Sequence, residues 1–386
     1  MTLNVFLDAK PLYYKEINHE RIHIAYGMLK LHIKQPTTLH IVGTNGKGST
    51  GRIVAHLTYK SGYSVGHYSS PHILKFNERI WIDGADVSDE VLDNAHQKLF
   101  TILGQEMSDA LSYFEYTTLL AFIVFENCDL MVLEAGLGGE FDATNVCNKE
   151  LSIITPIGID HQAFLGDTIE EIASTKIRSI QKQVLLASQP YVEVVEVAKK
   201  IANEKGAVLR QAQEPGNIKV TELVEVAEAN GWADYLITNA TVALEALDIL
   251  NIKYDINDLK SLELFGRFYA LTPHIRIDVG HNPLAARAIE KALDKKVVLI
   301  YNSLDDKDYE EVLRILKPKV KRVEIIKIHS QRATTLEEIE KALQVVGLEY
   351  SYFENNISEE ENYLVFGSFY VVEEFLKQRK ERDVPK

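Results

Sequence analysis

The sequence predicts an α/β protein, with a parallel-sheet domain followed by a second, smaller α/β domain. Short apolar, β-branched runs alternate with helical stretches, the pattern of strands that are buried on both faces of a parallel sheet. The first of these runs leads directly into a glycine-rich turn. The alternation restarts near residue 273, and 386 residues are enough for two or three domains of ordinary size.

Four buried strands are predicted in the first domain. They cover residues 37–42, 129–136, 151–158 and 182–188. A helix is expected to follow the first strand and to end at Gly62, and another helix is expected at 170–180. Residues 67–80 are polar and aromatic, with a proline after two serines, so we expect a loop there.

The second domain is predicted from a further series of strands and helices. The strands cover 274–280, 296–302, 323–328 and 363–368, and the helices cover 283–295, 308–317, 336–346 and 369–382. Pro283 suits the first turn of its helix, where the missing N–H has no partner to lose. We take 261–272 as the linker, which assigns residues 1–265 to the first domain and 266–386 to the second.

The composition excludes several classes of protein. Acidic residues outnumber basic ones, 56 against 42, and a net charge of −14 disfavours nonspecific binding to nucleic acid or an anionic membrane. Two cysteines cannot form a disulfide scaffold, and the start of the chain lacks the pattern of a signal peptide. The longest apolar run, 119–125, is far short of the roughly 20 residues of a membrane span. We therefore expect a cytoplasmic protein.

The strongest local signal is the segment Gly-Thr-Asn-Gly-Lys-Gly-Ser at 43–49, between a strand and a helix. Its glycines allow the backbone N–H groups to point inward at phosphate oxygens, next to the positive end of the following helix. Lys47 can neutralise the β- and γ-phosphates, and the hydroxyl of Ser49 can bind Mg²⁺. The alternative is a glycine-rich turn that binds nothing. The usual P-loop pattern does not fit, because here the lysine precedes the last glycine.

Further candidate residues follow the other strands. Glu134 lies at the carboxyl end of a strand, where open α/β sheets bind ligands, and a carboxylate there suits Mg²⁺. Ser70 lies in the predicted 67–80 loop, which is either a surface loop or a cover for the nucleotide. His161 is either a metal ligand or a packed histidine. Lys176, on the helix at 170–180, is expected on the side of the same site.

The second domain offers fewer candidates. Asp278 follows a strand and is suited to accept a hydrogen bond from a ribose hydroxyl. Asn282 before Pro283 is a good N-cap for the next helix. Arg267 lies in the presumed linker, from which its guanidinium could reach phosphates when the domains close.

Taken together, these segments resemble the folylpolyglutamate synthase/dihydrofolate synthase family of the Mur ligase superfamily. The motifs carrying the resemblance are GTNGKGS (43–49), SSPH (69–72), FNERI (76–80), SYFEYTT (112–118), EAGLGGEFDATN (134–145), DHQAFLGDT (160–168), GRF (266–268), DVGHNP (278–283), DKD (306–308) and GS (367–368). The resemblance implies a P-loop parallel-sheet ATPase domain followed by a smaller, Rossmann-like α/β domain.

The resemblance also implies roles for individual residues. ATP would be held by Thr44, Asn45, Gly46, Lys47, Gly48, Ser49, Asn239, Arg267 and Asp278. The metal ligands would be Ser49, Ser70, Glu134 and His161. Lys47, His161, Lys176 and Arg267 would be catalytic, and Lys176 matches a lysine that the family carbamylates, although here the surrounding residues are Thr-Lys-Ile-Arg-Ser. Substrate would contact Phe114, Glu115, Thr117, Thr118 and His281, with the first four near the pterin and His281 near glutamate.

The activity that the resemblance implies is ATP- and Mg²⁺-dependent ligation of L-glutamate to dihydropteroate, to reduced folates or to both, through an acyl phosphate. One or two Mg²⁺ ions, and K⁺ as a further cation, remain open. We expect a monomer with small-molecule substrates. The alternatives are another Mur-ligase-type amino-acid ligase and a catalytically inactive nucleotide-binding module. A switch GTPase is disfavoured, because the isolated Asp-Lys-Asp at 306–308 does not supply a guanine-reading motif.

Overall fold

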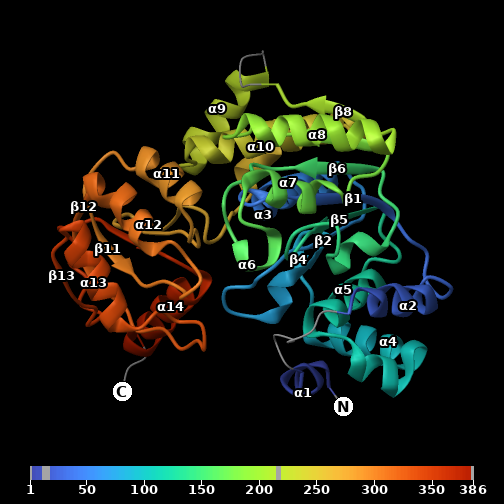
Figure 1. Cartoon of the computed structure of the whole chain (residues 1–386), viewed down its shortest axis with the longest axis horizontal. Coiled ribbons are helices and arrows are strands. Elements are labelled where there is room, and N and C mark those ends of the chain that lie inside the picture. The colour runs from blue at the N-terminus through green and yellow to red at the C-terminus, as the bar shows by residue number, and fades with distance from the viewer. Residues whose placement is uncertain (1, 11–17, 214–218, 384–386) are drawn as a thin grey trace. The chain divides into compact units, whose positions relative to one another are not determined.

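A computed structural model describes residues 2–10, 18–213 and 219–383 of the chain (Figure 1). The contacts divide the chain into two compact units. The first comprises Met1–Glu222 and Asn239–Leu262, and the second comprises Leu223–Thr238 and Glu263–Lys386. Each unit is built around its own β-sheet, as the sequence predicted for an α/β protein.

The sheet of the first unit has eight strands in the order β4-β3-β2-β5-β1-β6-β7-β8. The bounds are β1 Thr37–Val42, β2 Val65–Tyr68, β3 Ile80–Ile82, β4 Ala85–Asp86, β5 Leu130–Glu134, β6 Leu151–Ile154, β7 Gln183–Leu186 and β8 Val208–Gln211. The pairings from β2 to β8 are parallel, whereas β3 and β4 pair antiparallel at one edge. The four predicted strands are confirmed as β1, β5, β6 and β7.

The segment predicted as a loop at 67–80 is a loop only in its middle. Its first residues complete β2 and its last residue begins β3, with a short 3-10 helix, η1, at Phe76–Arg79. Glu78 organises the turn by accepting hydrogen bonds from the amides of Ile73, Leu74 and Lys75. Sequence reasoning missed the two strand ends because the antiparallel partner, Ile80–Ile82, contains only three residues.

The helices of the first unit pack on both faces of its sheet, the arrangement expected for buried parallel strands. The bounds are α1 Leu3–Asp8, α2 His19–Leu29, α3 Lys47–Lys60, α4 Asp89–Ala110, α5 Tyr113–Val124, α6 Gln162–Leu165, α7 Ile169–Ile177 and α8 Val192–Lys205. The helices α1, α2, α4 and α5 share one apolar core, in which α4 lies beside both α2 and α5 (Figure 1). The helices α7 and α8 form another core with β6 and β7.

The sheet of the second unit has six strands in the order β13-β12-β11-β14-β10-β9. The bounds are β9 Tyr269–Thr272, β10 Ile275–Ile277, β11 Val297–Tyr301, β12 Val320–Ile325, β13 Tyr350–Tyr352 and β14 Tyr363–Phe366, with helices α11 Pro283–Ala292, α12 Tyr309–Leu316, α13 Leu336–Val346 and α14 Phe369–Asp383. All predicted elements of this unit are present. Part of the presumed linker, however, forms the edge strand β9, which pairs antiparallel with β10.

Two helices that begin at residue 219 and beyond belong partly to each unit. They are α9 at Lys219–Asn230 and α10 at Asp234–Ile249, and residues Leu223–Thr238 group with the second unit. The reason is packing and hydrogen bonding. Ala233 joins the apolar core of the second unit, and the Tyr235 hydroxyl donates to Asp278 Oδ2 at 2.9 Å. The division predicted at residue 265 assigns 223–238 to the first domain, whereas the contacts group these residues with the second unit.

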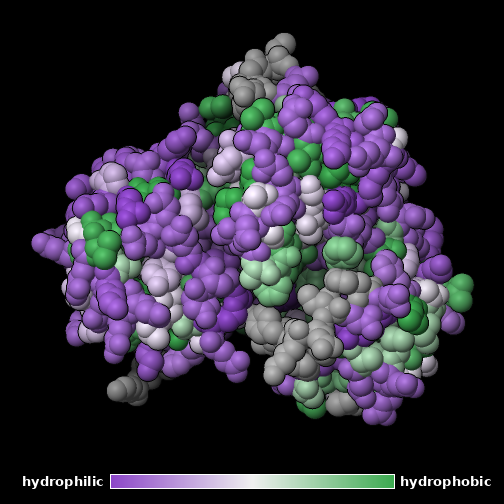
Figure 2. All heavy atoms as spheres, viewed as in Figure 1, coloured by the Kyte–Doolittle hydropathy of each residue, from purple (hydrophilic) through white to green (hydrophobic). Residues whose placement is uncertain are grey.

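The surface of the molecule is largely polar on the face shown in Figure 2. Cys128 and Cys147 are both free thiols and both buried. Across residues 2–10, 18–213 and 219–383, none of the helices combines the length and the apolarity that crossing a membrane requires.

Candidate active site

The glycine-rich segment 43–49 forms a tight loop between β1 and α3. Gly43 and Gly46 have positive φ angles of 148° and 87°, which other residues rarely adopt. A Cβ atom on Gly43 would lie 2.0 Å from Thr155 Oγ1, and one on Gly46 would lie 2.7 Å from Asn239 Oδ1. The loop therefore needs glycine at both positions for conformation and for space.

The loop is held against the segment that follows β6. The amides of Thr44 and Asn45 donate to the carbonyl oxygen of Pro156, at 3.0 and 3.1 Å. The Thr44 hydroxyl donates to the Gly158 carbonyl and accepts from the Gly158 amide, both at 3.1 Å. These contacts fix the shape of the loop, and the role of Thr44 in nucleotide binding stays a prediction.

Charged and polar groups converge beside this loop. Lys47 Nζ lies 3.9 Å from Glu134 Oε1 and donates to the carbonyls of Gly43 and Thr44. Glu134 is only 5% exposed at the end of β5, and its Oε2 accepts from the Ser70 amide at 3.3 Å. The structure thus brings together three residues that are separated by up to 87 positions in the chain.

Ser49 and Asn239 meet on the other side of the loop. Asn239 lies on α10 within the first unit, and its Nδ2 donates to Ser49 Oγ at 2.8 Å. Both side chains are nearly inaccessible. The prediction that Asn239 belongs to the nucleotide site gains support from this contact, because Ser49 is the hydroxyl that the sequence pattern assigns to the metal.

The donors around Glu134 suit Mg²⁺. This ion prefers carboxylate and hydroxyl oxygens and commonly binds through one or two carboxylates together with substrate phosphates. Within the described residues, no group of three His, Cys, Asp or Glu side chains could hold a metal ion by itself. Glu134 therefore suits an ion that is shared with nucleotide phosphates better than an all-protein metal centre, and Ser49 and Ser70 as further ligands stay predictions.

His161 lies in the segment after β6, a few residues beyond Pro156 and Gly158, which hold the glycine-rich loop. Its backbone is left-handed, with φ 54°, and it precedes α6. Its Nε2 lies 3.9 Å from Asp160 Oδ2. The role of His161 as a metal ligand stays a prediction.

Lys176 reaches the phosphate loop from α7. Its Nζ donates to the Gly43 carbonyl at 3.0 Å, and the side chain is 4% exposed. The helix begins with a capping box, in which Thr168 Oγ1 accepts from the Glu171 amide and the Glu171 carboxylate accepts from the Thr168 amide. Lys176 is thus placed at the predicted site, while its carbamylation stays a prediction.

The predicted pterin segment lies on α5, with its residues in different environments. Phe114 is partly exposed, and its ring contacts Tyr68 and the backbone of Gly136. Glu115 pairs with Arg21 at 2.6 Å and closes the capping box of α5 with Ser112. The hydroxyls of Thr117 and Thr118, both fully buried, donate to the Phe114 carbonyl. Of these residues, Phe114 is partly exposed while Glu115, Thr117 and Thr118 are buried, and their place near the pterin stays a prediction.

The loop 134–145 after β5 is held by buried polar groups. Asp142 accepts from the Leu137 amide, the Thr144 amide and the Thr144 hydroxyl, and burial raises the pKa of its carboxyl. Lys149 donates to Asn145 Oδ1 and to the Ser179 carbonyl, and burial lowers the pKa of its amine to about 8. These contacts fix the loop that carries Glu134 at its start.

The second unit contains Arg267, Asp278 and His281. Asp278 is 4% exposed and accepts from the Gly280 amide, the Phe268 amide and the Tyr235 hydroxyl. Burial raises the pKa of Asp278, and burial beside this carboxylate raises that of Tyr235. His281 lies near the Val279 carbonyl, and Asn282 caps α11 as predicted. Asp278 is therefore an internal acceptor as well as a candidate for ribose.

Sequence reasoning missed several residues around these sites. Arg79 Nε donates to His72 Nδ1 at 2.8 Å, and its guanidinium lies 5.4 Å from the centre of the Tyr113 ring. Tyr235 was also missed. No local pattern could have revealed Tyr235, because its partner lies 43 positions away in the sequence.

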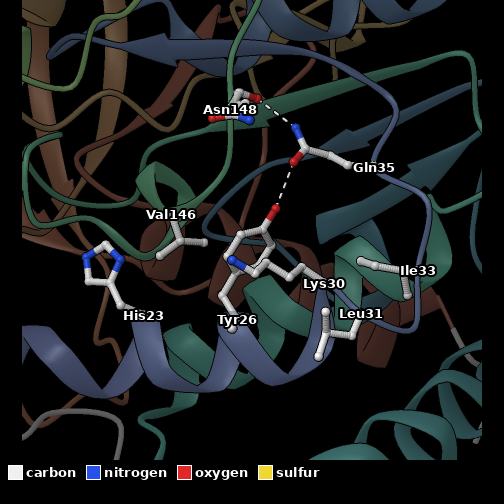
Figure 3. Close-up of a pocket in the computed structure, with 9 residues that line it drawn as sticks. His23, Tyr26, Lys30, Leu31, Ile33, Gln35, Val146 and Asn148 are labelled. Atoms are coloured by element: carbon white, nitrogen blue, oxygen red, sulfur yellow. Dashed lines mark hydrogen bonds between the residues drawn. The ribbon is translucent and has the colours of Figure 1, made fainter.

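A separate cavity of about 560 Å³ lies beside α2 (Figure 3). The Tyr26 hydroxyl donates to Gln35 Oε1, and Gln35 Nε2 donates to the Asn148 carbonyl, both at 2.7 Å. Gln35 precedes the start of β1, whereas the phosphate loop follows its end. Ligands of open α/β sheets bind at the carboxyl ends of strands, so this cavity is distinct from the nucleotide site. None of its lining residues was predicted from the sequence.

Comparisons with known proteins agree with this geometry. No family model matches the chain. A curated relative from Haemophilus influenzae, named dihydrofolate synthase/folylpolyglutamate synthase, is 30% identical over 95% of this chain and 93% of its own length. The crystal structure of Helicobacter pylori folylpolyglutamate synthetase is 41% identical, covers 98% of both chains and has a TM-score of 0.80. E. coli FolC in complex with DHPP and ADP is 26% identical, covers 100% of this chain and 99% of its own, and has a TM-score of 0.84.

Proposed function

This chain belongs to the dihydrofolate synthase/folylpolyglutamate synthase family, and on that premise we propose that it ligates L-glutamate to dihydropteroate, to a reduced folate or to both. The enzyme is an ATP-dependent ligase that acts through an acyl phosphate. The single observation that supports this most directly is the meeting of Lys47, Glu134 and the Ser70 amide beside the glycine-rich loop. A related synthase has been solved with Mn, AMPPNP and L-glutamate bound.

The first step activates the acid. A carboxylate does not react with an amine, because its oxygens are poor leaving groups. A carboxylate oxygen of the pteroate or folate attacks the γ-phosphorus of ATP, the bond to the bridging oxygen breaks, and ADP leaves. Catalysis of such a step is mainly positioning and charge stabilisation. Lys47 and the backbone amides at the start of α3 would provide the positive groups that hold the phosphates, since the amides of Thr44 and Asn45 are bonded to Pro156.

The second step forms the amide. The α-amine of glutamate attacks the carbonyl carbon of the acyl phosphate, the carbon–oxygen bond to phosphate breaks, and inorganic phosphate leaves. The amine loses one proton in the process. The second unit supplies His281 as the proposed contact for glutamate, and Arg267 and Asp278 as proposed contacts for the nucleotide.

Glu134, with the hydroxyls of Ser49 and Ser70, would hold Mg²⁺. A divalent ion there supplies positive charge that offsets the repulsion between ATP and the anionic acid. Lys47 lies 3.9 Å from Glu134, so the lysine and a cation held by the carboxylate could contact the same phosphates. His161 as a further ligand, a second Mg²⁺ and K⁺ belong to the same proposal.

The acceptor acid is proposed to lie against Phe114. This side chain is the partly exposed aromatic residue of the 114–118 segment and is packed on Gly136, two residues after Glu134. We place the reaction in the cytoplasm, where the free thiols Cys128 and Cys147 would stay reduced. We propose that the enzyme works as a monomer.

The test is phosphate release from ATP in the presence of glutamate and either dihydropteroate or tetrahydrofolate, with product masses measured. Release with dihydropteroate alone means a dihydrofolate synthase, and release with both means a bifunctional enzyme. Lys47→Ala should lower either rate by at least about 100-fold, because charge stabilisation at the transferred phosphoryl group is lost.

Lys60→Ala is the matched control, since Lys60 is an exposed lysine at the other end of α3. It should leave both rates unchanged. Phosphate release with neither acceptor, despite ATP binding, would contradict the folate assignment and favour another amino-acid ligase or an inactive module. A wild-type rate in Lys47→Ala would contradict the proposed role of the phosphate loop in phosphoryl transfer.

A further inference from the structure

The turn that carries Arg267 has an unusual backbone. Phe268, the next residue, has a left-handed conformation with φ 48°. Bulky side chains rarely adopt this region, and such residues persist where their surroundings hold them in place. The Arg267 guanidinium donates to the Gly266 carbonyl of the turn at 3.1 Å and lies 5.4 Å from the centre of the Phe369 ring. The direction of Arg267 therefore depends on what holds the turn.

Hydrogen bonds hold the turn at several backbone groups, among them the Arg267 amide, which donates to the Leu264 carbonyl at 3.1 Å. The Gly266 carbonyl accepts from the Val279 amide at 3.0 Å, and the Phe268 carbonyl accepts from Arg276 Nη1 at 2.9 Å. The Phe268 amide donates to Asp278 Oδ2 at 2.8 Å. The contact with Asp278 depends on the orientation of its carboxylate, so it lasts only while that carboxylate is held in place.

Tyr235 fixes the same carboxylate oxygen. Its hydroxyl donates to Asp278 Oδ2 at 2.9 Å, while the Gly280 amide donates to Asp278 Oδ1 at 2.7 Å. Asp278 is 4% exposed, so water can do little to replace a lost donor. Both oxygens are thus held by the protein, and the oxygen that accepts from Phe268 is held by Tyr235.

We propose that Tyr235 is a positioning residue for nucleotide binding, which acts by holding Asp278, and through it the left-handed Phe268 turn, so that Arg267 points in a fixed direction. This inference rests on the proposed function, because it assumes that Arg267 contacts ATP. It adds a residue outside the sequence motifs, contributed by the first turn of α10.

Tyr235 could also affect ATP binding through α10 itself, and the experiment must separate this effect from one that acts through Arg267. Tyr235 and Asn239 are four residues apart on α10, so they project from the same side of the helix. Asn239 donates to Ser49 at the phosphate loop. Loss of the Tyr235 hydroxyl could in principle alter ATP binding by disturbing Asn239, without involving Arg267.

The test is Tyr235→Phe, which removes the hydroxyl and keeps the ring. We expect the KM for ATP to rise about fivefold to tenfold with a smaller change in kcat, the size of one ordinary hydrogen bond, because the lost contact acts on ATP only indirectly. The dissociation constant of ADP, measured by calorimetry without any acceptor acid, should rise by the same factor. Tyr352→Phe is the matched control, because Tyr352 also donates to a carboxylate, that of Glu340, in the same unit.

Combining Tyr235→Phe with a second substitution shows which residue carries its effect on ADP binding. In Arg267→Ala, the added effect of Tyr235→Phe on the ADP dissociation constant should disappear, because the residue through which it acts is gone. In Asn239→Ala, the effect should persist. An effect that persists without Arg267, or that disappears without Asn239, overturns the proposal, and so does an unchanged dissociation constant in Tyr235→Phe alone.

Failure of this inference can be told apart from failure of the proposed function. If Arg267→Ala weakens ADP binding and Tyr235→Phe does not, Arg267 keeps its role and the positioning by Tyr235 is wrong. If the wild-type enzyme ligates glutamate to neither acceptor, the proposed function is wrong, while the ADP measurements still decide the role of Tyr235. Thermal unfolding of each variant shows whether the fold is retained.

Discussion

At the scale of single residues, the site is defined by a few side chains that meet over long distances in sequence. Lys47 and Glu134 end up 3.9 Å apart, and Lys176 bonds to the Gly43 carbonyl across 133 positions. Each of these residues lies at the end of a regular element or within one, so the scaffold determines its position. Rigid elements place functional groups more accurately than loops do.

Glu134→Gln is expected to raise the Mg²⁺ concentration needed for half-maximal activity by at least about tenfold. Glutamine has the same shape but carries no charge, so the attraction for the cation falls while the packing at the end of β5 is retained. The measurement is the rate of phosphate release as a function of Mg²⁺ at saturating ATP. Glu126→Gln, which affects the Glu126–Lys98 ion pair, is the control. An unchanged Mg²⁺ requirement would exclude Glu134 as a ligand.

The sequence predicted those residues whose signal is local. Glycine-rich spacing revealed 43–49, and a carboxylate after an apolar run revealed Glu134. Tyr235 carried no such signal, since its importance comes from Asp278, 43 positions further along the chain. The hydroxyls of Thr117 and Thr118 are fully buried and bond to the backbone of their own helix, so their predicted place near the pterin stays a prediction.

At the scale of elements, strands and helices with strong periodicity were predicted with nearly correct bounds. The strand predicted at 37–42 is β1, and the helix predicted at 336–346 is α13. The elements that were missed are stabilised by partners distant in sequence. The edge strand β9 forms inside the presumed linker because β10 supplies its hydrogen bonds. Composition could not mark the segment 223–238, whose place in the second unit is set by contacts with residues beyond 262.

Thr168→Ala is expected to lower the free energy of unfolding by about 1 kcal/mol, because it removes the N-cap of α7. Since α7 carries Lys176, the KM for ATP should rise modestly as well. Urea denaturation gives the stability, and Thr168→Ser, which keeps the hydroxyl, should recover most of it. A loss of stability that serine does not reduce would mean that the Thr168 methyl group matters more than the cap.

At the scale of the whole molecule, burial of histidines should make stability sensitive to acid. Burial lowers the pKa of His72 to about 4 and holds those of His40 and His67 well below the usual value. All three residues lie in the first unit. Between about pH 4 and the ordinary value of 6.5, the unfolded chain binds protons that the folded protein does not, so stability falls as the pH falls.

His72→Asn should reduce this dependence by at most about 1.4 kcal/mol per pH unit, the equivalent of one proton. Asparagine can still accept a hydrogen bond from Arg79, so the variant should fold. Urea denaturation at several pH values between 4.5 and 6.5 measures the slope, with His32→Asn at an exposed position as the control. If the slope in His72→Asn equals that of the wild type, His72 does not contribute to acid sensitivity.

The excursion of residues 223–238 into the second unit has a consequence for how the protein can be dissected. The chain passes between the units three times, at 222/223, 238/239 and 262/263. No single cut in the gene therefore yields either unit. A fragment that starts at the linker would lack both Ala233, part of its apolar core, and the hydroxyl that holds Asp278. Domain exchange between related synthases would have to carry two separate stretches of coding sequence, and the shorter of them encodes the start of α10.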